Sequence, residues 1–143
     1  MLGRSLGGAV GIHTSALHDA AGNEYIKGVV IENTFTSISD MTDAILPPLQ
    51  RIPALKNLML RLNWDSLSQV KNIKMPIFYV SGDHDTFVPF EMTLKLAKET
   101  KNSIHKEMYI VRGGDHNNTY AVGGREYLRR LREFLETAAR VHN

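Results

Sequence analysis

Three short apolar runs along the chain predict buried β-strands. They cover residues 26–32, 76–81 and 107–111, and they consist largely of Val, Ile, Phe, Tyr and Met. Apolar residues fill these runs instead of alternating strictly with polar ones, which is typical of strands that are covered on both faces of a parallel sheet. We therefore expect about three parallel strands in the interior of the molecule.

Helical segments lie before, between and after these runs. Residues 5–21 are rich in small side chains, and residues 89–101 and 124–141 repeat apolar side chains at helical spacing. Strands that alternate with helices indicate right-handed β-α-β units. The pattern therefore predicts an α/β fold, with a parallel sheet flanked by helices. The length of 143 residues suits a single domain over residues 1–143.

Residues 39–72 form a longer insertion between the first two predicted strands. It contains Pro47, Pro48 and Pro53, followed by an apolar and basic segment at residues 55–64. Because prolines interrupt helices, we expect two or three short helices that lie as a cap over one end of the sheet. A long crossover without a functional face is an alternative that gives the same pattern.

Charge and composition exclude several classes of function. Seventeen Lys and Arg residues against fifteen Asp and Glu residues give a formal net charge of +2, so no basic patch for nucleic acid is expected. The chain has no cysteine, which excludes disulfides, thiolate zinc sites and cysteine nucleophiles. No apolar stretch approaches the ~20 residues that span a bilayer, so no transmembrane segment is predicted in this chain.

The segment Gly3-Arg4-Ser5-Leu6-Gly7 matches the pattern G-x-S-x-G and leads into the first predicted helix. In this pattern the serine occupies a strained turn from a strand to a helix, where its Oγ is exposed and the glycines leave room for close packing. The backbone N–H of Leu6 would then point at the oxyanion that develops during acyl transfer. Alone, the pattern also fits a glycine-rich helix start packed on a sheet.

Two further loops carry an acid and a histidine. Asp85 lies in the loop after residues 76–81, and His116 lies in the loop after residues 107–111. Open α/β sheets bind their ligands at the carboxyl ends of the strands, so we expect both side chains at that end, with Ser5. The chain order serine, acid, histidine is that of α/β-hydrolases and differs from the orders of the two large serine-protease folds. The three loops together predict a serine hydrolase.

Four separate segments, which together run over almost the whole chain, resemble the Bem46-like α/β-hydrolases. In chain order they are residues 3–10, 32–38, 81–89 and 114–117. The resemblance implies an α/β-hydrolase fold in which Ser5 is the nucleophile, Asp85 is the acid of the triad and His116 is the general base. It also implies hydrolysis of ester or acyl substrates, and relatives that commonly carry an N-terminal membrane anchor.

These roles define an expected mechanism. His116 takes the proton of Ser5 as the serine attacks an acyl carbonyl, because a free hydroxyl is a poor nucleophile at neutral pH. Asp85 fixes the tautomer of His116 and stabilises the imidazolium. The expected substrate is a small carboxylic ester or thioester, which forms an acyl-enzyme at Ser5. The apolar face of residues 55–64 extends this expectation to lipid-like acyl chains.

Neighbouring polar residues compete for the same roles. Asp83 and His84 lie beside Asp85, but the family spacing places the acid three residues before Val-Pro, so we interpret both as solvated loop residues. Asp115 precedes His116 on the same tight loop and is expected to shape the turn. The sequence Glu-Asn-Thr at residues 32–34 ends the first predicted strand. It either braces the site or forms a plain turn with side-chain hydrogen bonds.

A metal site is a further interpretation of the same two loops. Their aspartates and histidines, namely Asp83, His84, Asp85, Asp115 and His116, could supply oxygen and imidazole ligands. Their spacing matches no known metal motif, however, and the triad explains the same residues. We expect no metal and no cofactor.

Only four residues precede Ser5, and we expect these to be too few for the strand that enters the serine turn in a complete hydrolase of this kind. Such a hydrolase also has several earlier strands and a second oxyanion donor. We therefore expect the chain to form the C-terminal part of the fold, with residues 26–32 at an apolar sheet edge that has no neighbouring strand. Such an edge predicts self-association. It also motivates the alternative that the chain is an inactive fragment or an interaction module.

Overall fold

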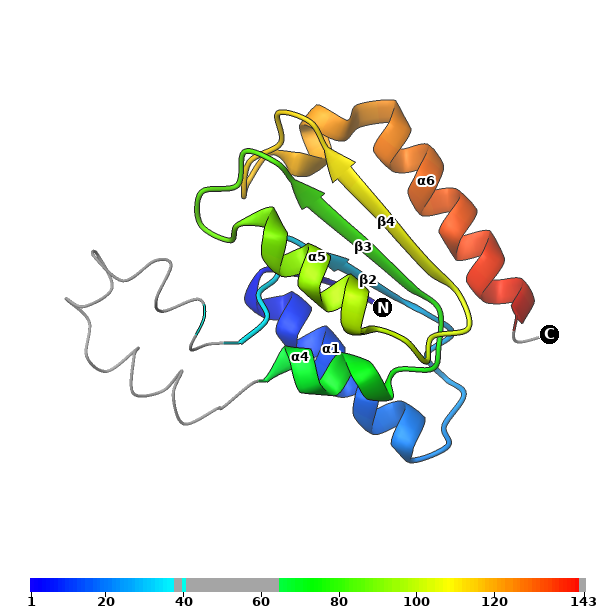
Figure 1. Ribbon diagram of the computed structural model, residues 1–143. Helices are drawn as coiled ribbons and strands as arrows, with labels where there is room; N and C mark the ends of the chain where they lie inside the picture. Colours follow the sequence, from blue (N-terminus) through cyan, green and yellow to red (C-terminus); the bar gives the residue numbers. More distant parts are fainter. Residues whose placement is uncertain (38–39, 41–64, 142–143) are drawn as a thin grey trace.

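A parallel sheet of four strands, in the order β1-β2-β3-β4, forms the centre of the molecule (Figure 1). The computed structural model describes residues 1–37, 40 and 65–141. The strands follow the chain order across the sheet and are β1 (Leu2–Arg4), β2 (Val29–Glu32), β3 (Ile77–Gly82) and β4 (Lys106–Val111). The predicted α/β fold is confirmed, and all three predicted strands are present.

β1 is the strand that the sequence analysis did not predict. It pairs in parallel with β2, with Leu2 opposite Val30 and Arg4 opposite Glu32. The prediction that the residues before Ser5 are too few for a strand is therefore wrong, because a three-residue segment can add to a strand that β3 already holds in place. In the described sheet β2 has a neighbour on each side, and the outer edge belongs to β1 instead.

Helices cover both faces of the sheet (Figure 1). One face carries α1 (Leu6–Ala20), α5 (Phe90–Glu99), the short α4 (Ser66–Gln69) and a 3-10 helix, η1 (Val70–Asn72). The other face carries α6 (Thr119–Val141), which a non-helical residue, Gly124 with φ 49° and ψ −128°, interrupts. The predicted helix of residues 124–141 begins at this interruption.

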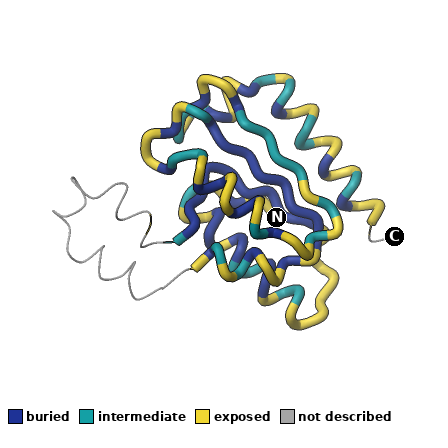
Figure 2. The backbone as a smooth tube through the Cα atoms, in the orientation of Figure 1, coloured by how far each residue is buried: buried dark blue, intermediate teal, exposed yellow. Residues whose placement is uncertain are grey.

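Among the described residues, two hydrophobic cores follow from the alternation of side chains along the strands. Ile31 and Tyr79 belong with Ile12 of α1 to one core, whereas Phe78 packs on Phe134 of α6 in the other. Their rings lie 5.5 Å apart between centroids. β2 and β3 are buried along their whole length (Figure 2). The prediction of strands covered on both faces is confirmed for these two, while β4 is only half-buried.

Of the predicted cap segment, only residue 40 and residues 65–72 are described. Residues 66–72 form α4 and η1, which pack against α1 and α5. Asp65 begins α4 by accepting a hydrogen bond from the Ser68 N–H over 3.0 Å. Residues 41–64, which include the apolar segment 55–64, lie outside the described residues, so the cap stays a prediction.

A substitution in the core around Phe78 and Phe134 tests how much this core contributes to stability. Phe134→Ala removes a fully buried ring and is expected to lower the free energy of unfolding by about 3–5 kcal/mol. Leu135→Ala is the matched control, because the Leu135 side chain is 53% exposed and its loss is expected to cost no more than about 1 kcal/mol. Urea unfolding followed by circular dichroism measures both; equal losses would contradict this assignment of the core.

The packing of β1 against α1 gives a second stability test. A Cβ at Gly3 would lie 2.2 Å from the carbonyl oxygen of Gly7, whereas a Cβ at Gly7 would meet nothing within 4 Å. Gly3→Ala is therefore expected to lower the free energy of unfolding by about 1–3 kcal/mol. Gly7→Ala is expected to leave it unchanged or raise it by up to about 1 kcal/mol, because Gly7 lies in a helix. The same urea unfolding measurement tests both variants. A Gly3→Ala variant as stable as the wild type would show that β1 does not pack this closely against α1.

Candidate active site

Ser5 occupies the turn between β1 and α1. Its backbone angles, φ 52° and ψ −123°, lie outside the regions that serine ordinarily adopts. Two hydrogen bonds hold the turn to the carboxyl end of β2 and the residues that follow it. The Ser5 N–H donates to the Glu32 carbonyl oxygen over 2.9 Å, and Thr34 Oγ1 donates to the Ser5 carbonyl oxygen over 2.6 Å. Angles of this kind persist where surrounding contacts enforce them, and they gather at functional sites.

The side chains of Ser5, His116 and Asp85 lie in one hydrogen-bonded chain. His116 Nε2 lies 3.1 Å from Ser5 Oγ, and His116 Nδ1 lies 2.8 Å from Asp85 Oδ2. The His116 side chain is 15% exposed and that of Asp85 is 0% exposed. With the proton on Nδ1, the ring donates to the carboxylate and presents the Nε2 lone pair to the serine hydroxyl, which is the arrangement that a base-activated nucleophile needs.

The Asp85 carboxylate is fixed on its other oxygen as well. Asp85 Oδ1 accepts hydrogen bonds from the N–H groups of Phe87 and Val88, over 2.9 and 2.8 Å. Both oxygens are thus engaged, which keeps Oδ2 directed at His116. The two competing aspartates have other partners. Asp83 Oδ1 accepts a hydrogen bond from Gly113 N–H over 2.6 Å, joining the two loops.

Asp115 contacts the backbone of its own loop. Its Oδ1 accepts hydrogen bonds from the N–H groups of Asn117 and Asn118, over 2.7 and 2.8 Å. This closes the turn that presents His116, as expected for a residue that shapes the loop.

Leu6 is the first residue of α1. The N–H groups of the first helical turn have no acceptor within the helix, and the amino end of a helix favours negative charge. The Leu6 N–H directly follows Ser5, and this position is compatible with a donor to the oxyanion. The role of Leu6 as an oxyanion donor stays a prediction.

The contacts of two neighbours of the site do not follow from the sequence. The Phe87 ring lies 5.6 Å from the His116 ring between centroids and is 53% exposed, so it flanks the histidine on the solvent side. The segment 32–34, for which two interpretations are open, contacts the turn of Ser5 and the loop of His116. The only sequence signal for it is a run of polar residues directly after a buried strand.

Glu32 and Tyr127 tie α6 to the strand beside Ser5. Tyr127 Oη donates to Glu32 Oε2 over 2.5 Å in the interior. Burial, followed by the hydrogen bond and charge of Glu32, raises the pKa of Tyr127 above its ordinary value of 10.0. The phenol therefore stays protonated and remains a donor throughout the physiological range.

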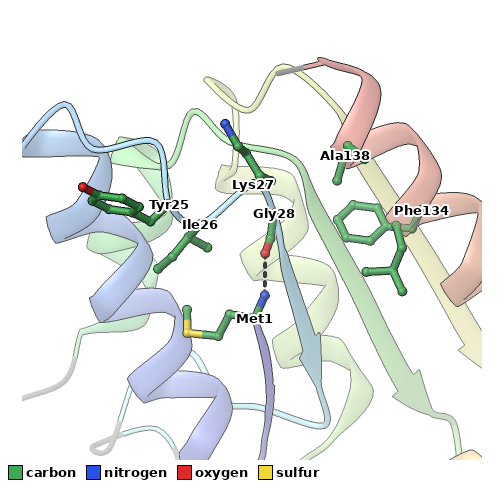
Figure 3. A pocket seen from close by; sticks show the side chains of 9 residues that line it. Met1, Tyr25, Ile26, Lys27, Gly28, Phe134 and Ala138 are labelled. Atoms are coloured by element: carbon green, nitrogen blue, oxygen red, sulfur yellow. Dashed lines mark hydrogen bonds between the residues drawn. The ribbon is translucent and has the colours of Figure 1, made fainter. Parts of the chain in front are cut away.

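A hollow of about 280 Å³ lies at the opposite end of the sheet, where β1 and β2 begin (Figure 3). Ile26, Phe134 and Ala138 line it, and the amino group of Met1 donates to the Gly28 carbonyl oxygen there over 2.8 Å. Burial lowers the pKa of this amino group. Ser5 follows the carboxyl end of β1, so the hollow is not part of the candidate active site.

Two features are absent from the described part of the chain. No three His, Asp or Glu side chains in that part are grouped as ligands for a metal ion. None of the helices described there combines the length and the apolar character that a membrane span requires.

Comparisons with known proteins identify relatives along nearly the whole chain, although no model of a protein family matches the sequence. The chain is 32% identical over 148 aligned residues to the "Alpha/beta hydrolase domain-containing protein WAV2" of Arabidopsis thaliana, covering 97% of this chain and 47% of that protein. It is 34% identical over 88 residues to "Protein bem46" of Schizosaccharomyces pombe, covering 61% of this chain and 27% of that protein. The chain thus spans less than half the length of each relative.

The solved structures agree on the fold. An esterase of Pyrococcus furiosus matches with a TM-score of 0.75 at 19% identity, covering 96% of this chain and 52% of the esterase. At that identity the likeness shows a shared fold alone. The sequence relatives narrow the assignment further: the chain belongs to the Bem46-like α/β-hydrolases.

Proposed function

We propose that the protein is a serine hydrolase that cleaves carboxylic ester or thioester bonds through an acyl-enzyme at Ser5. The observation that carries the proposal is the hydrogen-bonded chain from Ser5 Oγ through His116 to Asp85, with distances of 3.1 and 2.8 Å. A hydroxyl, an imidazole and a buried carboxylate in this order supply a nucleophile, a general base and a group that orients the base.

The proposed reaction has two half-reactions that balance. In the first, Ser5 Oγ bonds to the acyl carbon as its proton moves to His116 Nε2, and the same proton then leaves with the alcohol or thiol when the acyl bond breaks. In the second, His116 Nε2 takes a proton from water as the water oxygen bonds to the acyl carbon. The bond between Ser5 Oγ and the acyl carbon then breaks, the carboxylic acid leaves, and Ser5 Oγ recovers the proton from His116 Nε2. Asp85 stays ionised and stabilises the imidazolium in both halves.

The strained turn supports this reaction in a second way. Because Ser5 directly precedes α1, the N–H of Leu6 adjoins the position at which the carbonyl oxygen becomes an oxyanion. A backbone donor of this kind contributes on the order of 100- to 1,000-fold in rate. The esterase with the same fold supports an ester as the substrate class, and a thioester offers the same acyl carbonyl to the serine.

Hydrolysis of p-nitrophenyl acetate and of a short acyl thioester tests the proposal. Ser5→Ala, His116→Gln and Asp85→Asn are each expected to lower kcat/KM by about 1,000-fold or more, because each removes one member of the proton path. Thermal unfolding of every variant verifies that the fold is retained.

Ser15→Ala is the matched control for Ser5→Ala. Ser15 lies in α1 and is fully buried, and its Oγ has no hydrogen-bond partner among the described residues. Its loss is expected to leave kcat/KM within about twofold, since the side chain is remote from the proton path. A folded wild-type chain whose hydrolysis is absent, or survives Ser5→Ala, would contradict the proposal and favour the non-catalytic alternative.

A further inference from the structure

We propose that Asn33 is a positioning residue that holds the loop of the general base against the turn of the nucleophile. The inference rests on the proposed function for its catalytic consequence. Asn33 follows β2 directly, is 0% exposed and has a positive φ of 45°. Asparagine is one of the few non-glycine residues that adopt such angles readily.

The side-chain amide of Asn33 donates to the loop that carries His116. Nδ2 lies 2.9 Å from Thr119 Oγ1 and 3.3 Å from the His116 carbonyl oxygen, with the Asp115 carbonyl oxygen at 3.4 Å. Thr119 Oγ1 in turn donates to the Asp115 carbonyl oxygen over 2.6 Å. The amide therefore fixes the backbone on both sides of the base.

The opposite end of the same amide reaches the strand that leads to the acid. Asn33 Oδ1 accepts a hydrogen bond from Gly82 N–H over 3.0 Å, and the Asn33 N–H donates to the Val80 carbonyl oxygen over 3.0 Å. Gly82 in turn accepts from the Asp85 N–H over 3.3 Å. One buried side chain thus connects the loops of Asp85 and His116.

The two residues beside Asn33 hold the nucleophile. The Glu32 carbonyl oxygen and Thr34 Oγ1 bind the N–H and the carbonyl oxygen of Ser5, over 2.9 and 2.6 Å. Gly8 leaves space for this contact, because a Cβ there would lie 2.6 Å from Thr34 Cβ. Residues 32–34 therefore fix the serine and the histidine from one segment, and the bracing interpretation of this motif is the one that the contacts favour.

Asn33→Asp distinguishes the contacts that the amide N–H groups donate from the contact that the amide oxygen accepts. It keeps the shape, the tolerance of positive φ and the acceptor for Gly82 N–H, but it replaces the two amide protons with an oxygen that faces the carbonyl oxygens of Asp115 and His116. The His116 loop is then expected to move away. A displacement of about 1 Å at a reacting group lowers rates by up to about 100-fold.

The primary test is the rate of Ser5 labelling by a fluorophosphonate probe, with the final extent of labelling recorded separately. Asn33→Asp is expected to lower the rate constant by about 10- to 100-fold at an unchanged final extent. A merely structural role would lower the extent, because unfolded molecules do not react, and would leave the rate of folded molecules unchanged.

Asn102→Asp is the matched control. Asn102 Nδ2 also donates to a backbone carbonyl, that of Lys71 over 2.6 Å, but on the exposed surface. The labelling rate constant of Asn102→Asp is expected to stay within about twofold of the wild-type value. If Asn33→Asp does not fold, Thr119→Val removes the hydroxyl that accepts from Asn33 and is expected to slow labelling in the same way.

The NMR resonances of the His116 imidazole separate this inference from the proposed function. We expect them to shift in Asn33→Asp and to keep their wild-type positions in Asn102→Asp. The inference would be overturned if the wild type is labelled and the folded Asn33 and Thr119 variants show neither a slower labelling rate nor a shifted His116 resonance. That result would leave the proposed function intact. Absence of wild-type labelling together with the expected shift would overturn the proposed function and retain the positioning role.

Discussion

The backbone turn at Ser5 is the constraint on which the candidate site depends. A serine at φ 52° and ψ −123° stores on the order of 1–3 kcal/mol of strain, and it persists because β1 and α1 are held on either side of it. The pairing of β1 with β2 fixes the strand end, and the contacts of Glu32 and Thr34 fix both peptide groups of Ser5. Without this support the hydroxyl would relax away from His116.

The parallel sheet turns this local constraint into a site. Residues far apart in the chain meet because every strand ends at the same edge of the sheet. Ser5 follows β1, residues 33 and 34 follow β2, Asp85 follows β3 and His116 follows β4. The two cores keep the strands in register from both faces, so the 3.1 and 2.8 Å distances are consequences of the whole sheet and not of any single loop.

Much of this arrangement is predictable from the sequence. The physical reasons for this also explain which parts are not predictable. β2 and β3 are mostly apolar because both faces are covered, so composition alone identifies them. β1 is too short, at three residues with one buried, to produce a periodic signal. The contacts of Asn33 are not predictable for another reason. Its partners lie far along the chain, 49 positions away for Gly82 and 86 positions away for Thr119, and only the fold brings them within hydrogen-bond distance.

Locating the adduct that a small fluorophosphate forms on the folded chain tests most directly whether the turn presents an activated Ser5. Trypsin cuts after Arg4 and Lys27, so Ser5 begins a peptide of residues 5–27 that also contains Thr14 and Ser15. Fragment-ion mass spectrometry distinguishes these hydroxyls. We expect one adduct per chain, on Ser5. An adduct on another residue, or none on the folded protein, would contradict the claim that the turn presents an activated nucleophile.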